Sequence, residues 1–404
     1  MTSTTDPQEG SFRLSMLVND TRYRSYTFQF IALILLIALM SYLVANLMAN
    51  LEAAGLNISF GFLQQASGYD INQSLLEYDS RSSHLRAAVV GIINTILVAF
   101  LACITATIIG VIAGVLRLSK NWLVAKLMAV YVEAFRNVPV LIWILIIYTV
   151  LTAVLPAPSA FRGEEPTSSM LFGAFAFTNR GIYIPAPVFG PGGLAVVVTF
   201  LASLAAIFMW RRHAVKQLYA HGKVLPVTWP TVALFFVPTL LVFFVLGSPI
   251  SLDLPALQGF NFQGGIQIGA PLIALWLALS IYTGAFIAEN VRAGIQAISK
   301  GQTEAAASLG LRPRRVMNLV VLPQALRVII PPLISQYLNI TKNSSLAIAV
   351  GYADVTATLG GITLNQTGRA IECVLLLMLF YLTISLLISA VMNVYNKSVS
   401  LKER

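Results

Sequence analysis

Charged side chains interrupt otherwise apolar stretches of the sequence at Glu133, Arg136 and Lys342. An ionisable group is costly in an apolar environment, so these residues are candidates for lining a polar pathway. Asn343 and Ser344 follow Lys342 and add hydrogen-bonding groups that a polar solute could contact. Pro139 follows Arg136 closely and is expected to kink or break the span, and broken helices commonly line a cavity. We therefore expect the five charged and polar residues to line a solute pathway. An alternative is open for Glu133 and Arg136, because residues three apart on a helix can form an ion pair that only neutralises both charges.

The sequence has no residues with the spacing of a catalytic or metal site. His84, His213 and His221 are scattered among polar segments and lack the spacing of metal ligands or of a partnered nucleophile. Cys103 and Cys373 lie in apolar runs and form no CxxC pair. The G-x-x-x-x-G-K loop, ending in Ser or Thr, that cradles ATP phosphates is also missing. We therefore expect neither enzyme activity nor a metal or cofactor site in this chain.

The composition indicates that membrane-spanning helices position the charged residues. Hydrophobic residues make up 57% of the 404-residue chain and charged residues only 10%, with a mean hydropathy of +0.79, whereas soluble domains carry about 25% charged residues. Apolar runs of about 20 residues, the length that spans a bilayer core, predict eight helices. These runs are residues 28–49, 89–116, 124–155, 193–210, 229–247, 268–289, 328–350 and 371–394. They are too long for barrel strands, so the predicted fold is an all-α polytopic membrane protein.

The basic residues lie mostly on one side of the predicted membrane. Nineteen Lys and Arg residues fall on the side that holds the N-terminus, and five fall on the other side. By the positive-inside rule, both termini and residues 211–228 are expected to be cytoplasmic. Residues 50–86 and 156–192, which are rich in turn-forming and polar residues, are expected to form ordered loops on the outer face. This distribution accounts for the net charge of +10 without nucleic-acid binding.

The cytoplasmic segment 299–323 predicts a helix, a break and a second helix. Ser299 and Gln302 have the spacing of a capping box, so a helix is expected to begin there. Gly310 can take the left-handed conformation that ends a helix, and Pro313 suits the first turn of the next helix. Glu304, Ala305 and Ala306 give the first helix a stretch with one charge and little side-chain bulk, so its surface can fit a groove in another protein.

The same segment carries a motif of spaced residues. They are Glu304, Ala305, Ala306, Gly310, Leu322 and Pro323. Their spacing resembles the EAA loop of ABC importer permeases, in which EAA, three residues, Gly and nine residues precede I-x-L-P; Val320 stands here in place of the Ile. In that family the loop docks on the ATPase subunit. The resemblance implies that the three EAA residues face an ATPase groove, and that ATP and Mg²⁺ are bound by this partner.

Further segments resemble the polar amino-acid permeases, the histidine and glutamine branch of that family. They are residues 94–95, 131–139, 288–295, 301–302, 323–325 and 341–346. The resemblance covers residues 89–155 and 268–394 and implies a type I permease core of five helices. The first predicted helix and the hairpin of the fourth and fifth would be three additional helices. Such enlarged subunits resemble those of general L-amino-acid and glutamate/glutamine/aspartate/asparagine importers, in which two different permease chains pair.

The spans and the resemblance together imply an order of parts along the chain. The parts are a cytoplasmic N-terminus (1–27), an extra span with its outer loop (28–88), the first part of the core (89–155), an outer loop with the inserted hairpin (156–267), the second part of the core with the 299–323 loop (268–394) and a cytoplasmic tail (395–404). Glu289 and Arg292 are three apart at the cytoplasmic end of the sixth predicted span. We expect them to form a salt bridge.

The function implied by the resemblance is the movement of amino acids across a bacterial inner membrane by the multi-pass permease subunit of an ATP-driven importer. The implied partners are an ABC ATPase dimer, a second homologous permease chain, a periplasmic amino-acid-binding protein, the amino-acid substrate and membrane lipid. The pathway residues would offer donors to the carboxylate of an amino acid and acceptors to its ammonium group. An ion-coupled secondary transporter is the alternative, because it could share the spans and the buried charges without an ATPase.

Overall fold

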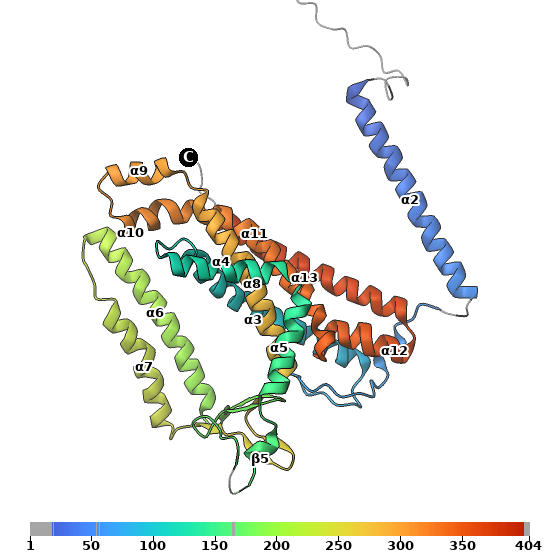
Figure 1. Ribbon diagram of the computed structural model, residues 1–404, viewed down its shortest axis with the longest axis horizontal. Coiled ribbons are helices and arrows are strands. Elements are labelled where there is room, and N and C mark those ends of the chain that lie inside the picture. Colours follow the sequence, from blue (N-terminus) through green and yellow to red (C-terminus); the bar gives the residue numbers. More distant parts are fainter. Residues whose placement is uncertain (1–17, 19, 54, 56, 164–165, 400–404) are drawn as a thin grey trace, which may run out of the picture. The chain divides into compact units, whose positions relative to one another are not determined.

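The computed structural model describes residues 18, 20–53, 55, 57–163 and 166–399 and is mostly helical (Figure 1). Among these described residues, eight helices are long and apolar enough to span a membrane. They are Tyr23–Ala53, His84–Leu116, Val140–Phe161, Gly193–His221, Thr228–Val245, Ala270–Gln296, Pro313–Val350 and Ala370–Lys397. The predicted helical fold with eight spans is thus confirmed. Most of the predicted segment 1–27, and residues 400–404 of the predicted tail, lie outside the described residues.

The chain divides at Gly61 into two compact units, each of which is described by itself. The N-terminal unit contains α2, Thr21–Ala53. Apolar side chains occupy every face of this helix. A helix with this pattern suits an environment of lipid on all sides.

The predicted third span, 124–155, is broken into two helices, α4 (Trp122–Asn137) and α5 (Val140–Val154), as Pro139 predicts. Val138 between them is extended, with φ −113° and ψ 134°. The break follows from Pro139, because proline lacks an N–H and disfavours helical geometry in the residue before it. The charged residues near the end of α4 therefore lie on a separate helix and not within a continuous span.

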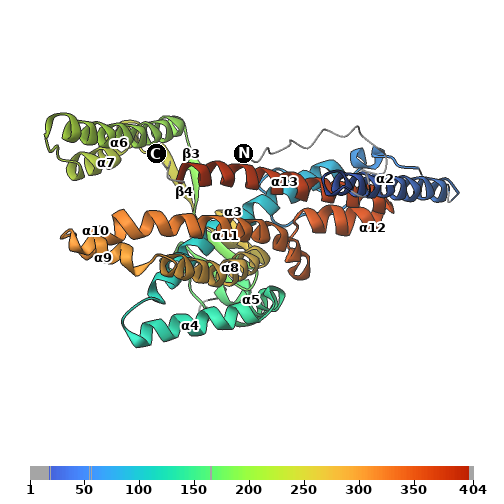
Figure 2. The same cartoon turned by 90° about the horizontal axis from the view of Figure 1, so that it is seen from above.

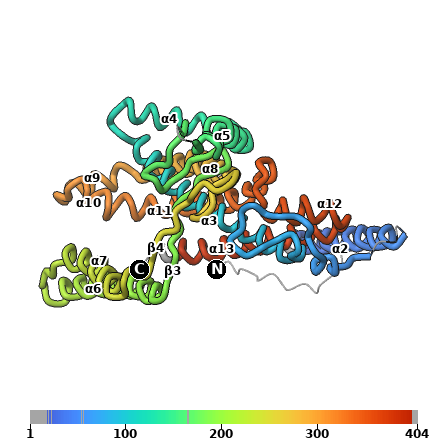
Figure 3. Tube along the Cα trace, turned by 90° about the horizontal axis from the view of Figure 1, so that it is seen from below, coloured from blue at the N-terminus to red at the C-terminus, as the bar shows by residue number. Residues whose placement is uncertain are grey.

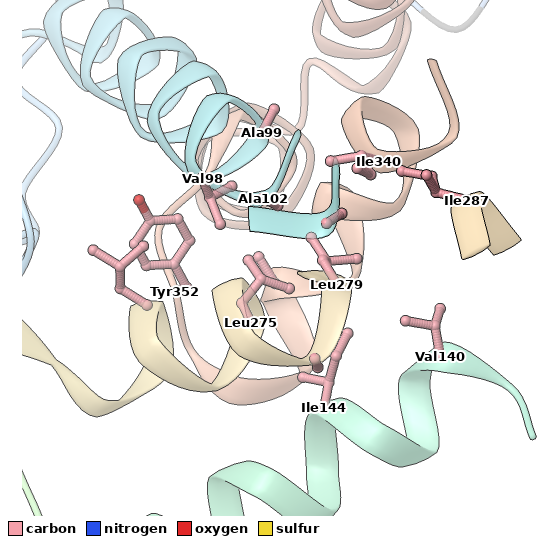
Figure 4. Packing of buried hydrophobic residues seen from close by; sticks show 14 of the residues in the cluster. Val98, Ala99, Ala102, Val140, Ile144, Leu275, Leu279, Ile287, Ile340 and Tyr352 are labelled. Atoms are coloured by element: carbon pink, nitrogen blue, oxygen red, sulfur yellow. The ribbon is translucent and has the colours of Figure 1, made fainter. Parts of the chain in front are cut away.

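The core of the second unit is centred on α3 (His84–Leu116) and α8 (Ala270–Gln296). Buried side chains from α3, α5, α8 and α11 (Leu322–Asn343) meet there (Figure 4). They include Val98, Ala99, Ala102, Ile144, Leu275, Leu279 and Ile340. Small residues at this interface let the helix backbones approach closely, as is common between membrane helices.

The inserted helices α6 (Gly193–His221) and α7 (Thr228–Val245) pack side by side as a hairpin (Figures 1 and 2). α6 continues well past the predicted span 193–210, so Arg211, Arg212 and Lys216 are helical and not in a loop. It ends at Gly222, whose φ of 64° is the left-handed conformation of a C-terminal cap.

The segments that flank this hairpin contain short antiparallel strands, which the sequence did not predict. The strands are β1 (Ala176–Thr178), β2 (Gly181–Ile184), β3 (Ala186–Phe189), β4 (Ile250–Asp253), β5 (Ala256–Gln258), β6 (Asn261–Gln263) and β7 (Ile266–Gly269). β2 pairs with β1 and β7, β5 pairs with β6, and β3 lies beside β4 (Figure 3). We call residues 166–189 and 250–269 the β region. Tyr183 and Phe262 are buried in its small core.

After α8 the chain forms α9 (Lys300–Ser308) and then a long helix whose hydrogen-bond pattern changes along its length. The parts of this long helix are α10 (Pro313–Val316), the π-helical η3 (Met317–Val321), α11 and the 3₁₀-helical η4 (Ser344–Val350). The π-helical η5 (Thr356–Thr363), α12 (Leu364–Thr367) and α13 (Ala370–Val399) follow it. Two further 3₁₀ turns are η1 (Gly61–Gln64) and η2 (Pro158–Phe161). The predicted span 328–350 therefore ends in a tighter turn than an α-helix.

Candidate functional site

The predicted helix, break and helix are present in segment 299–323 (Figure 2). Gly310 follows α9 with a φ of +76°, a conformation that favours glycine because it has no Cβ. Pro313 is the first residue of α10, as predicted. The predicted capping box is not formed. Ser299 is the N-cap residue, but its side chain makes no capping hydrogen bond, and the N–H of Gln302 donates to the backbone oxygen of Ser299 (3.1 Å).

The side chains of α9 divide between an exposed face and a buried face. Glu304 and Ala305 are exposed. Ala306 is only 6% exposed and packs with Val316 and Val321. The expectation that all three EAA residues face outward is therefore wrong for Ala306. Its small side chain instead allows α9 to lie closely against α10 and η3.

Leu322 and Pro323 form the first turn of α11, directly after the π-helical segment. The N–H of Leu322 donates to the carbonyl oxygen of Met317, five residues earlier. Pro323 has no N–H and crowds the carbonyl of the preceding turn, so the wider π turn accommodates it. The Leu-Pro pair therefore marks the point where the loop helix becomes the spanning helix.

Four charged residues, Arg117, Glu133, Glu289 and Arg292, form a charge cluster at the ends of α3, α4 and α8. The Arg292 guanidinium lies 2.5 Å from the Glu289 carboxylate, which confirms the predicted salt bridge. Arg117 also pairs with Glu289, and its guanidinium is 3.6 Å from the Glu133 carboxylate. Partly buried, multiply bonded pairs of this kind hold their partners more firmly than isolated surface pairs do.

The alternative ion pair between Glu133 and Arg136 is not formed. Glu133 faces Arg117, as described above. The Arg136 guanidinium lies 5.2 Å from the centroid of the Phe286 ring, in a cation–π contact with α8. Among the described residues, the Nε of Arg136 is buried without a hydrogen-bond partner. The two charges therefore bind α4 to different parts of the core and do not neutralise each other.

Known proteins are similar to this chain over nearly its full length. A family model described as a binding-protein-dependent transport system inner membrane component matches residues 198–401. The chain is 52% identical to the glutamate/glutamine/aspartate/asparagine transport system permease protein BztB of Rhodobacter capsulatus, over 100% of both chains. It is 45% identical to the general L-amino acid transport system permease protein AapQ of Rhizobium johnstonii, over 98% of this chain and 96% of that protein. The chain belongs to the binding-protein-dependent permease family.

A solved structure described as an amino acid ABC transporter with histidines is 19% identical, with a TM-score of 0.45 over 78% of this chain and 95% of that chain. Membership of the permease family makes this chain an integral inner-membrane component of an ABC importer. An importer permease of this kind operates with an ATPase and a binding protein. The family is one of transport components, which agrees with the expectation that this chain is not itself an enzyme.

The predicted pathway residues of this permease do not form one site. Glu133 and Arg136 on α4 contact α3 and α8. Lys342 and Asn343 end α11, where Lys342 is exposed. Ser344 is buried, and its hydroxyl donates to a backbone carbonyl of α11 (2.7 Å). Within the described part of the chain, no hydrogen bond or ion pair connects the α4 pair with the three residues at the end of α11.

Leu309 is a residue of the permease loop that sequence reasoning did not single out. It lies directly before Gly310 and exposes 81% of its surface. The sequence feature that could have identified Leu309 is a large apolar side chain beside a helix-ending glycine in a polar loop. It extends the exposed face of α9 beyond Glu304 and Ala305.

Asp354 is a second residue that sequence reasoning did not single out. It is fully buried, and its Oδ1 accepts the N–H of Ala357 (2.8 Å), while its Oδ2 has no partner among the described residues. Burial raises the pKa of Asp354 to about 6. The residue follows the left-handed turn at Gly351 (φ +75°), in a segment whose sequence indicates only a loop.

Proposed function

We propose that this chain is the permease subunit of an ATP-driven importer that carries amino acids across a bacterial inner membrane. The observation that carries this proposal is the complete EAA spacing on an exposed helical loop between two spanning helices, α8 and α11. The names of the two relatives above support amino acids as the substrate class, with glutamate, glutamine, aspartate and asparagine favoured by the first. The alternative of an ion-coupled secondary transporter has no comparable support.

The proposed coupling loop consists of Glu304, Ala305, Ala306, Gly310, Leu322 and Pro323. Glu304 and Ala305 would contact the ATPase from the exposed face of α9. Ala306 on the opposite face lies in a cluster with Val316 and Val321, and Ile295 from the end of α8 packs on that cluster. Because α9 is packed on both neighbouring segments, a push from the ATPase would move α8 and α11 together. The charge cluster would pass this movement to α3 and α4.

The partners and the orientation proposed for the chain follow the same reasoning. An ABC ATPase dimer would bind ATP and Mg²⁺, so this chain would need no cofactor of its own. A second homologous permease chain would complete the pathway, and a periplasmic binding protein would deliver the amino acid. The uneven distribution of basic residues supports cytoplasmic termini.

Reconstitution tests the proposed function directly. The chain, co-expressed with its partner subunits, is inserted into liposomes with ATP enclosed and the binding protein outside. We expect labelled glutamate or glutamine to accumulate only when ATP and binding protein are both present. Accumulation driven by a proton or sodium gradient without ATP would replace this proposal with the secondary transporter.

We also propose that Glu133, Arg136, Lys342, Asn343 and Ser344 belong to the substrate pathway. Lys342 carries the proposal best, because it is an exposed charge at the end of a spanning helix. We expect Lys342→Met to lower amino-acid uptake about tenfold or more, the effect of losing one hydrogen bond to a charged group. ATP hydrolysis and subunit assembly should be retained.

The control for this variant is Lys120→Met, which removes an exposed charge from the turn between α3 and α4. It should leave uptake unchanged. Normal uptake by Lys342→Met would remove Lys342 from the pathway, and failure of that variant to assemble would assign the residue a structural role.

A further inference from the structure

A polar cavity of about 490 Å³ lies where the β region meets the start of α8. Five separate segments line it: the stretch before α3, Tyr148 of α5, the β region, the start of α8 and residues 351–353. Its polar side chains include Asn72, Asn179, Arg180, Asn261 and Gln267. This volume is within the range of about 300–1,000 Å³ that is usual for sites of small molecules.

Hydrogen bonds hold the walls of this cavity in place. The Gln73 side chain accepts the N–H of Gly269 (2.8 Å) and donates to the backbone oxygen of Gln267 (3.3 Å). The Asn94 amide of α3 donates to the backbone oxygens of Gln73 (2.8 Å) and Ala353 (2.9 Å). The stretch before α3, strand β7 and residues 351–353 are thus fastened to one another. The cavity is therefore preformed and needs little reorganisation to bind a solute.

The electrostatics of the cavity favour a carboxylate. Arg180 is the one Lys, Arg, Asp or Glu side chain among the described residues that line it. Its guanidinium has five N–H donors, of which Nη1 bonds to the backbone oxygen of Phe260 (3.2 Å). The 27-residue helix α8 also begins at the cavity, with Ala270 and Leu272 in its wall and no side-chain cap at Gly269. The positive end of the helix dipole therefore adds to the charge of Arg180.

The same cavity contains acceptors for a positive group. The amide oxygens of Asn72, Asn261 and Gln267 can accept from an ammonium group, and their N–H groups can donate to a polar side chain.

We propose that this cavity binds a free α-amino acid with a carboxylate or amide side chain before it enters the membrane pathway. The α-carboxylate binds Arg180 and the start of α8, and the ammonium group binds amide oxygens of the cavity wall. The site rests on the proposed importer function, because only then does an amino acid reach this face. The cavity lies on the β region, which flanks the inserted hairpin. These flanking segments therefore form part of a substrate site in addition to connecting the hairpin to the core.

Thiol labelling of the complete transporter tests the site. Asn72→Cys places a thiol at an exposed position of the cavity wall, and Gln267→Cys provides a second reporter. An impermeant maleimide is applied to right-side-out vesicles without binding protein, and the parent chain corrects for reaction at Cys103 and Cys373. We expect millimolar glutamine or glutamate to slow labelling. An equal concentration of 4-aminobutanamide, which lacks the α-carboxylate, should not.

Two matched arginine variants identify the anchor. Arg180→Gln should raise the half-protecting concentration of glutamine about tenfold or more, because the carboxylate loses a charge-assisted hydrogen bond. Arg162→Gln removes the same charge from the same region, but Arg162 lies over the Phe260 ring (5.4 Å) and does not line the cavity. It should keep full protection. If Arg180→Gln does not assemble, Arg180→Lys takes its place. It keeps the charge but loses the planar guanidinium donors, so the half-protecting concentration of glutamine should rise by a smaller factor.

Uptake by the parent transporter separates the two proposals. Normal ATP-driven uptake combined with no protection, with equal protection by 4-aminobutanamide, or with no labelling at either reporter would overturn the cavity site and leave the importer function standing. Absence of amino-acid uptake in the complete system would instead overturn the importer function. Protection that depends on Arg180 and not on Arg162 would support the site.

Discussion

A Gly310→Val variant is expected to insert at near-normal levels but to lose ATP-driven amino-acid uptake. Gly310 has a φ of +76°, and no atom lies within 4 Å of the position that a Cβ would take. The added side chain therefore clashes with nothing and acts only on the backbone, where left-handed geometry costs an L-residue about 1–2 kcal/mol and is worse for a β-branched one. The loop should relieve this strain by turning α9 away from its docking position, because the spans themselves are untouched.

The measurements for this variant are its level in the membrane, the ATPase retained on purification, and uptake. Gly368→Val is the matched control: Gly368 has a φ of +67° and equally open surroundings, but it lies between α12 and α13. Arg312→Ala is a second control within the loop, where the arginine makes no side-chain cap. Both should retain the ATPase. A Gly310→Val variant with a full complement of ATPase and normal uptake would require the docking role of this loop to be abandoned.

The spans could be predicted because length and apolarity decide them almost independently of packing. Their ends could not, because a helix continues after it leaves the bilayer for as long as its hydrogen bonds and caps allow. α6 shows this difference, since it ends only at Gly222 and not where its apolar run ends. The break before α5 could be predicted from Pro139, because proline acts on the backbone through its own ring and not through distant partners.

Two pairs with the same spacing show the limit of local reasoning about charges. Glu289 and Arg292 form the expected salt bridge, whereas Glu133 and Arg136 do not. Spacing decides which side chains share a helical face, but the partners on other helices decide which contacts form. Arg117 at the end of α3 meets both glutamates, and its position follows from packing that no local pattern records.

The same limit applies to the loop and to the outer face. The sequence correctly placed the turn at Gly310, because glycine has a conformational property that other residues lack. It could not show that Ala306 points inward, because the partners that bury it follow in a later helix. The β region was missed because strands of three or four residues are too short to show alternation, and β2 pairs with β7 across the inserted hairpin.

The packing of α3 on α8 depends on small residues that recur every four positions. They are Ala102, Ala106, Gly110 and Gly114, all buried. A Cβ added at Gly110 would lie 2.5 Å from the Cβ of Ile287 and 2.9 Å from the backbone oxygen of Gly284. Real Cβ atoms essentially never come so close to another heavy atom. Without a hydrophobic driving force between helices in lipid, this close approach supplies much of the contact energy.

We therefore expect Gly110→Ala to lower the apparent melting temperature of the detergent-solubilised complex, and Gly110→Leu to prevent its assembly. Overpacking costs about 1–3 kcal/mol and more for larger side chains, because a helix backbone cannot move aside as a flexible side chain can. Gly301→Ala is the control, since nothing lies within 4 Å of a Cβ added at this exposed position of α9. It should stay within about 0.5 kcal/mol of the parent. Unchanged melting of Gly110→Ala would mean that α3 and α8 are not held in the close contact that the structure gives them.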